Sequence, residues 1–259
     1  MRRICLLIVV AAGLTALAGG AAGPAVARVE HAPPVRLLSP IGRGTARSLN
    51  WSGYAAYQAG TTFTDVKGSW TQPAASCRGG QKQYASFWVG LDGYNSSSVE
   101  QIGTDSDCNG NNRAVYYAWY ELYPAPPVNL SLAVHPGDVI SAEVSASGST
   151  FTLSLVNQTT GANFSTTQSV AGAALSSAEW VAEAPSRCAA TCSVLPLANF
   201  GTVNFTGSYA TGNGHTGSIG DGAWSNDQIV MVTSSLQTKA QPSALSPDGT
   251  AFSVAWKHS

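Results

Sequence analysis

The sequence predicts an all-β protein built as a two-sheet antiparallel β-sandwich. Three observations support this: short alternating or aromatic runs recur, turn-forming pairs separate them, and amphipathic helix patterns are nearly absent. About 210 residues follow Arg47, which is enough for one sizeable domain. No internal repeat period is evident, which argues against a propeller.

Ten runs with this character are expected to be strands. They are Trp51–Tyr57, Val66–Trp70, Tyr84–Val89, Val115–Tyr123, Val139–Ala146, Thr150–Asn157, Glu179–Ala184, Val203–Tyr209, Gln228–Val232 and Ala251–Trp256. Glycine-containing turn signals lie between them. They are Gly79-Gly80, Asp92-Gly93, Asn109-Gly110, Pro136-Gly137, Thr160-Gly161, Gly212–Gly214 and Asp248-Gly249.

Polar and aromatic side chains gather on single faces of three predicted strands. The two-residue period places Trp119 with Glu121, and Glu179 with Glu183, on one face each. Gln101 belongs to a further run, Ser98–Gly103, and we expect this run and the one around Glu183 to be half-buried strands. A lone glutamate on a strand is usually solvated. Together, however, these residues predict a concave binding surface.

The N-terminus predicts export. Residues 1–27 have a basic start, an apolar middle and an Ala-x-Ala end, as a secretory signal peptide does. A membrane anchor is the alternative, but the apolar run is too short to span a bilayer comfortably. No second run of spanning length follows, so we expect a secreted, extracellular protein with no membrane partner.

Charge divides the chain into a basic start and an acidic body. Residues 1–47 hold six arginines and one glutamate, a net charge of +5, whereas residues 48–259 carry −6. Residues 28–47 are rich in arginine and proline, and such a segment is unlikely to build a core. It is either a passive linker or a pro-segment whose cations lie over an acidic cleft. The acidic body argues against nucleic acid as a partner.

Cysteine usage agrees with export. Cys5 leaves with the leader, and four cysteines remain, which allows two disulfides in three connectivities. We favour Cys77–Cys108 and the local pair Cys188–Cys192. A zinc site is the alternative, but no histidine lies near the Cys-x-x-x-Cys run.

Gln101 and Glu183 are the candidate chemical groups. A carboxyl group beside a carboxamide can move protons at a bound water and stabilise an oxyanion. The parts of other peptidases are missing: there is no Gly-x-Ser-x-Gly, no His-Glu-x-x-His and no Asp-Thr/Ser-Gly repeat. The chain after Arg47 has three histidines, none beside a serine or cysteine motif.

The chain resembles the glutamic peptidases, also called eqolisins or peptidase family G1. Six motifs carry the resemblance, in family order across the predicted domain 48–259. They are Asn50–Tyr54, Phe87–Gly93, Val99–Gly103, Tyr117–Pro124, Asn157–Gly161 and Ala178–Glu183.

This resemblance implies a concanavalin-like lectin or glucanase sandwich and an acid-active endopeptidase made with a removable pro-segment, here 28–47. It places the catalytic pair on Gln101 and Glu183. It implies cleft positions lining or supporting the site at Trp51, Trp88, Asp92, Trp119 and Glu121. We expect a monomer acting on protein or peptide substrates, inhibited by its own pro-segment, without cofactor or metal. Glu100 departs from the family pattern, which has an apolar residue there.

Two other function classes remain open at this point. A glycoside hydrolase would need two carboxyls flanking one bond, and Glu121 with Glu183 or Glu179 with Glu183 are the apt pairs. A lectin-like carbohydrate-binding module would use the aromatics for stacking and would often need calcium. The short run Asp105-Ser106-Asp107 is an ambiguous calcium signal.

Overall fold

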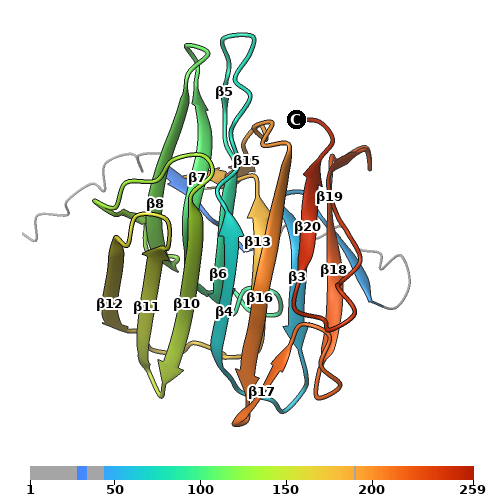
Figure 1. Cartoon of the computed structure of the whole chain (residues 1–259). Helices are drawn as coiled ribbons and strands as arrows, with labels where there is room; N and C mark the ends of the chain where they lie inside the picture. The colour runs from blue at the N-terminus through green and yellow to red at the C-terminus, as the bar shows by residue number, and fades with distance from the viewer. Residues whose placement is uncertain (1–27, 34–43, 190) are drawn as a thin grey trace, which may run out of the picture.

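The fold is a sandwich of two curved antiparallel sheets, as the sequence predicts (Figure 1). The computed structural model describes residues 28–33, 44–189 and 191–259. Over these residues it consists of strands and loops, without a helix. The predicted signal peptide lies outside the described residues.

The first layer faces the viewer of Figure 1 and carries no candidate site residue. Its neighbouring strands are, in order, β12 (Asn163–Ser169), β11 (Thr150–Asn157), β10 (Val139–Ser147), β4 (Phe63–Thr71), β16 (Thr202–Gly212), β20 (Phe252–Trp256) and β19 (Thr238–Pro242), with β17 (His215–Ser218) paired to β16.

The second layer carries the candidate site. Its order is β9 (Val128–Asn129), β8 (Ala114–Tyr123), β7 (Val99–Asn109), β6 (Ser86–Leu91), β13 (Ser177–Glu183), β3 (Trp51–Tyr57), β18 (Ser225–Val232) and β2 (Thr45–Ser48), with β5 (Lys82–Gln83) on β7. The β18–β19 pairing joins the two layers, and β2–β18 is parallel.

The main core fills the space between the layers. Trp70 and Phe205 of the first layer and Trp180 and Phe87 of the second are buried members of one apolar cluster. A second cluster, which includes Trp51, Trp88 and Trp119, is buried separately. Since Val181 belongs to the second cluster and its neighbour Trp180 to the first, the second layer buries apolar side chains on both faces.

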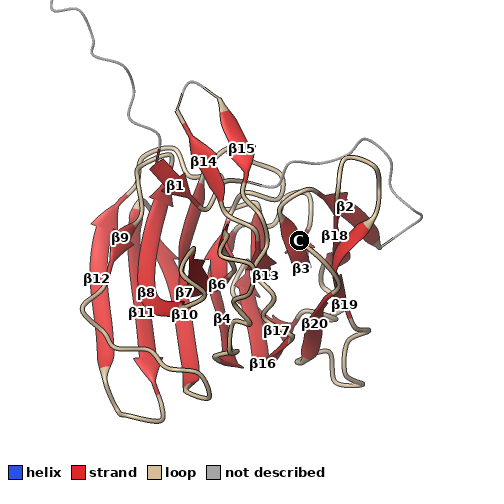
Figure 2. Ribbon diagram, turned by 90° about the horizontal axis from the view of Figure 1, so that it is seen from above, coloured by secondary structure: helices blue, strands red, loops and turns tan. Residues whose placement is uncertain are grey.

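That double burial corrects one expectation. The strands holding Gln101 and Glu183 were expected to be half-buried, but every residue of β13 is buried, as are Val99–Cys108 of β7. At Gln101 and Glu183 the reason is a cover: a small third sheet of β1 (Arg28–Glu30), β14 (Ser186–Cys188) and β15 (Cys192–Val194) leads residues 31–33 over the second layer. Figure 2 shows β1 beside β14 and β15.

All ten expected strands overlap first- or second-layer strands within a few residues at their ends. The run at Trp51–Tyr57 matches β3 at both ends. Strand β12 was missed, because its sequence Asn-Phe-Ser-Thr-Thr-Gln-Ser is polar; its pairing with β11 and the packing of Phe164 against Tyr120 stabilise it as a strand. The short strands β1, β2, β5, β9, β14, β15, β17 and β19 were also not expected.

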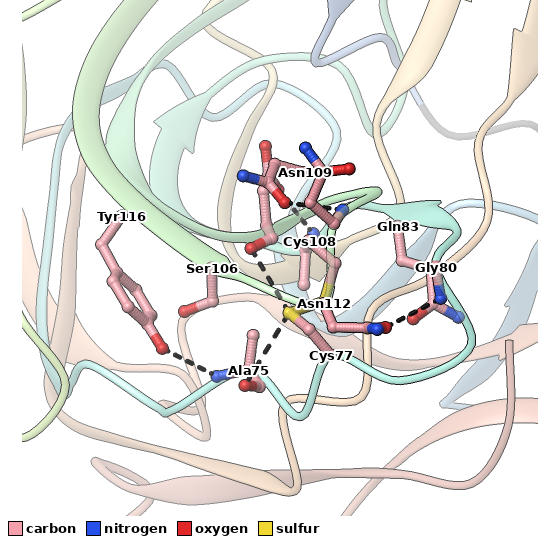
Figure 3. Close-up of a disulfide and its surroundings, with 12 residues drawn as sticks. Ala75, Cys77, Gly80, Gln83, Ser106, Cys108, Asn109, Asn112 and Tyr116 are labelled. Atoms are coloured by element: carbon pink, nitrogen blue, oxygen red, sulfur yellow. Dashed lines mark hydrogen bonds between the residues drawn. A yellow bond between two sulfur atoms is a disulfide. The ribbon is translucent and has the colours of Figure 1, made fainter.

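Both favoured disulfides are confirmed. Cys77 bonds to Cys108, and Cys188 bonds to Cys192. Figure 3 shows the first bridge fixing the loop before β5 to the end of β7, near Tyr116, whose hydroxyl accepts from the Ala75 amide at 3.2 Å. The zinc alternative is wrong, because all four sulfurs are used in disulfides.

Among the described residues, no helix is long and apolar enough to cross a membrane.

Candidate active site

The register of the second layer brings the candidate residues onto one face. β6 lies between β7 and β13, so Gln101 pairs with Gly90, and Glu183 pairs with Ser86. A Cβ on Gly103 would lie 2.5 Å from the Trp88 Cβ. Glycine at position 103 therefore lets the Trp88 side chain lie between the two candidate catalytic residues.

Gln101 is buried and its amide group is held in a defined orientation. Its Nε2 donates to Glu121 Oε2 at 2.9 Å and to the backbone carbonyl oxygen of His31 at 2.7 Å. Burial raises the pKa of Glu121 to about 8. The amide thus directs one N–H toward a peptide carbonyl, as an oxyanion donor must, while the other is held by Glu121.

Glu183 is buried beside two donors. Trp88 Nε1 donates to its Oε2 at 2.9 Å, and Asn50 Nδ2 lies 3.5 Å from its Oε1. Burial, followed by the nearby Glu121, raises the pKa of Glu183 well above its usual value, and the Trp88 hydrogen bond opposes that shift. A carboxyl group that keeps its proton in the covered site is poised for acid–base chemistry.

His31 fills the space over these residues. Its ring stacks on Trp119 with centroids 3.5 Å apart and planes 2° from parallel, and its backbone N–H donates to Glu121 Oε2 at 3.0 Å. Its Nδ1 is 3.7 Å from Glu183 Oε2. Burial lowers the pKa of His31 to about 3, so the ring is neutral in this position over most of the pH range.

The next residue, Ala32, is held by two other side chains of the site. Its carbonyl oxygen accepts from Trp51 Nε1 at 3.0 Å and from Asn50 Nδ2 at 3.1 Å. His31 and Ala32 therefore lie over the candidate site with their backbone groups bonded to site residues.

An acidic cluster lies behind Trp119. Trp119 Nε1 donates to Asp105 Oδ1 at 2.5 Å, and the Tyr117 hydroxyl contacts both Asp105 and Asp107 at 2.8 Å. Burial raises the pKa of Asp105 to about 7 and that of Asp107 well above its usual value. These contacts fix the Trp119 ring, and the cluster has aromatic partners rather than a calcium-loop geometry.

Of the seven candidate site residues, six gather around His31 and Ala32. They are Gln101, Glu183, Trp51, Trp88, Trp119 and Glu121. Asp92 has other contacts: its carboxylate accepts from the backbone N–H groups of Leu175 and Ser176 at 2.7 and 2.8 Å. Asp92 therefore anchors the loop that leads into β13.

Three residues at the site were not among the candidates. Asn50 was seen only as part of a motif, and Asp105 only as part of an ambiguous calcium run. His31 was missed altogether, although it is the one histidine between residues 28 and 47. That position within a segment expected to cover an acidic cleft was the available signal.

The described residues offer one possible metal cluster. Glu30, Cys188 and Cys192 place an oxygen and two sulfurs within 4.8 Å of one another. Because the two sulfurs form a disulfide, they cannot serve as thiolate ligands.

A sequence model of the Peptidase A4 family matches residues 49–253. The chain belongs to this family, which comprises the eqolisins or glutamic peptidases. The resemblance inferred from the six motifs is thereby confirmed.

A curated relative agrees with the assignment. Aspergillopepsin-2 of Aspergillus niger is 32% identical over 193 residues, which cover 65% of this chain and 66% of that protein, slightly under two thirds. Family membership therefore rests on the larger match to residues 49–253.

Solved structures of the family share the fold. Scytalido-glutamic peptidase with a transition-state analogue inhibitor is 28% identical with a TM-score of 0.70, over 80% of this chain and 98% of that one. SCP-B, an eqolisin in complex with the tripeptide Ala-Ile-His, is 26% identical with a TM-score of 0.66, over the same shares. Aspergilloglutamic peptidase from Aspergillus niger is 28% identical with a TM-score of 0.58, over 68% and 99%.

Proposed function

We propose that this peptidase A4 chain is a secreted, acid-active endopeptidase in which Glu183 is the general base and Gln101 the oxyanion donor. One observation carries the proposal. The backbone carbonyl of His31 accepts from Gln101 Nε2 at 2.7 Å. The ring nitrogen Nδ1 of the same residue lies 3.7 Å from Glu183 Oε2. The complexes of relatives with a transition-state analogue and with a tripeptide support peptides as substrates.

The chemistry follows from these positions. Glu183, as a carboxylate, takes a proton from a bound water, whose oxygen attacks the carbonyl carbon; such general-base assistance is worth roughly 10²–10⁴-fold. The Gln101 amide stabilises the oxyanion, which is worth about 3–4 kcal/mol for one donor. Glu183 then returns the proton to the leaving amine nitrogen. Gln101 does not titrate, so it keeps this role in acid.

The covering segment acts on the base. While residues 31–33 bury Glu183, the pKa of its carboxyl group is raised, so in acid the group is mostly protonated and only a small ionised fraction can act as a base. Departure of the segment returns water to the site and lowers this pKa. We therefore propose residues 28–47 as an inhibitory pro-segment and disfavour the passive linker.

A digestion assay tests the activity. Denatured protein should be cleaved at about pH 3 and not at about pH 7, with and without pepstatin. Pepstatin-resistant cleavage in acid supports the proposal. Sugar release without peptide cleavage would instead support the glycoside hydrolase, and sugar binding alone would support the lectin-like module.

Inhibition by a synthetic 28–47 peptide tests the pro-segment. Binding should be strong above the free histidine pKa of 6.5 and should weaken as pH falls toward the bound value of about 3, because only the neutral ring fits the covered site. Three carboxyl groups lie near this ring or near Trp119, those of Glu183, Glu121 and Asp105. Burial raises their pKa values, whereas it lowers that of His31, so their titration changes binding in the opposite direction. A His31→Phe peptide is the matched control, since those carboxyls act on both peptides.

The ratio of the two inhibition constants isolates the histidine. The natural peptide should lose up to about tenfold per pH unit relative to the Phe peptide as the solution is acidified. A ratio independent of pH would contradict the role of His31. If salt also weakens binding of the natural peptide, its arginines contribute to the affinity. Two of them, Arg36 and Arg43, lie outside the described residues.

A further inference from the structure

We propose that the His31–Ala32 peptide bond is the bond that the Gln101–Glu183 pair cuts in the chain's own N-terminal segment, with the residue before the cut chosen by stacking on Trp119. This inference rests on the proposed peptidase activity and names the processing site and the preferred substrate side chain.

The first argument is the position of the carbonyl. Of the segment's peptide groups, that of His31 is the one whose oxygen accepts from Gln101 Nε2, at 2.7 Å, among the described contacts. An oxyanion donor identifies the scissile carbonyl, because negative charge develops on that oxygen when water attacks. The bond that would break is therefore His31 C to Ala32 N.

The second argument is that hydrogen bonds fix the backbone on both sides of that bond. Upstream, the His31 N–H donates to Glu121 Oε2 at 3.0 Å. Downstream, the Ala32 carbonyl accepts from Trp51 Nε1 at 3.0 Å and from Asn50 Nδ2 at 3.1 Å. A peptide held on both sides of one bond has the limited freedom that a productive substrate needs.

The third argument is strand addition upstream. Val29 and Glu30 lie antiparallel to Arg187 and Ser186 of β14, whose hairpin with β15 is closed by the Cys188–Cys192 disulfide. Adding a strand to an exposed edge binds any sequence through its backbone and leaves selection to pockets for individual side chains. Other peptides can bind along β14 in the same way once the segment has left.

The fourth argument concerns side chains. His31 is 2% exposed and its ring lies parallel to the Trp119 indole with centroids 3.5 Å apart, and Ala32 is 5% exposed. A flat ring suits this surface, and a small residue suits the following position. We infer a preference for substrates with histidine, phenylalanine or tyrosine before the cut.

The reaction balances without any other reactant. One water oxygen adds to the His31 carbonyl carbon, and the bond to the Ala32 nitrogen breaks. The oxygen stays in the new His31 carboxyl group, and Glu183 passes the water's proton to the Ala32 amine. Because Glu183 is protonated while covered, this cut should be slower than that of an open-site substrate, so the segment inhibits before it is cleaved.

The test follows the exported full-length precursor by mass spectrometry after a shift from neutral pH to about pH 4, where free carboxyls titrate. Early time points should show a chain beginning at Ala32 and a fragment ending at His31, before any trimming toward Ser48. A Glu183→Gln precursor should show neither product. Its thermal unfolding checks that it is folded.

Two variants of the segment sharpen the outcome. His31→Phe should keep the cut after position 31, whereas His31→Gly should slow it at least tenfold; once the segment has been removed, the two mature enzymes are identical and should digest added denatured protein equally well. Digestion of denatured protein without an Ala32 terminus overturns this inference and leaves the proposed function standing. Equal rates for the Phe and Gly precursors overturn the stacking. If the unmodified protein cleaves neither its own segment nor added denatured protein, the proposed function is wrong as well.

Discussion

At the residue scale, the site depends on how two polar side chains are oriented by their neighbours. Glu121 fixes the Gln101 amide, and Trp88 with Asn50 holds Glu183. Glu179 is on the same strand face four residues earlier and is also fully buried, and burial raises its pKa well above the usual value. Its surroundings contain Ser177, Asp92 and Glu100, so it belongs to a separate acidic cluster.

The dyad predicts unequal effects of three substitutions. Gln101→Ala should lower kcat about 10²–10³-fold through loss of the oxyanion donor. Glu183→Gln should lower it by at least roughly 10²–10⁴-fold through loss of the base. Glu179→Gln, the matched control on β13, should remain active. Kinetics on a peptide substrate measure this, and an inactive Glu179→Gln with an active Glu183→Gln would refute the assignment.

Trp88→Phe should move the acid limb of the pH profile of kcat/KM to higher pH. The Trp88 hydrogen bond lowers the pKa of Glu183, so its loss raises that pKa, and the base is deprotonated only in less acidic solution. Trp51→Phe is the control, because the Trp51 indole N–H bonds to the Ala32 carbonyl instead of Glu183. An unchanged limb in Trp88→Phe, or a shift toward acid, would contradict the argument.

At the element scale, two disulfides of different span have different roles. Cys77–Cys108 joins the loop before β5 to the end of β7 across 31 residues of sequence, whereas Cys188–Cys192 closes a hairpin of separation 4. The first ties the site strand β7 to a loop. The second supports the edge to which β1 adds.

Removing each bridge should therefore change a different quantity. The Cys77→Ala/Cys108→Ala variant should lose about 2–4 kcal/mol of unfolding free energy, because its closed loop is long. The Cys188→Ala/Cys192→Ala variant should lose less stability but should raise KM several-fold with a smaller change in kcat. Denaturant unfolding and peptide kinetics separate the two, and a reversed pattern would refute the proposed role of the hairpin.

At the scale of the whole molecule, buried carboxyl groups make the fold suited to acid. Burial raises the pKa of Glu100 and Glu121 to about 8 and that of Asp105 and Asp65 to about 7. These groups are protonated in the folded chain and ionise near pH 4 in the unfolded one. Their contribution to stability is complete below about pH 4 and is lost as pH rises through 7 to 8.

We accordingly expect Tm to be highest in acid and to fall steadily as pH rises toward 8. Glu100→Gln tests a single contribution, since its near-isosteric amide cannot ionise, and the fall in Tm should become shallower. Scanning calorimetry across the pH range measures both. A Tm that rises with pH between these limits would contradict the assignment of neutral buried carboxyls.

The sequence alone predicted the fold class, favoured the two disulfides that the structure contains, and named six residues that the structure gathers around His31 and Ala32, and local chemistry explains why. Side chains alternate between the two faces of any strand. This placed Glu183 on the same face as Glu179, and Trp119 on the same face as Glu121, before the strand pairing was known. The motif order then identified the family. Glu100 already stood out as a departure, and the structure shows it as a buried acid.

Tertiary structure decided what local pattern cannot. Only the register across β6 shows that Gln101 and Glu183 share one site, and only the path of residues 28–33 shows His31 and Ala32 within it. The same cover buries Gln101 and Glu183 on strands expected to be half-buried, and loop packing draws Asp92 to Leu175 and Ser176. Contacts between residues far apart in sequence depend on chain closure and pairing, which one residue's neighbours in sequence do not specify.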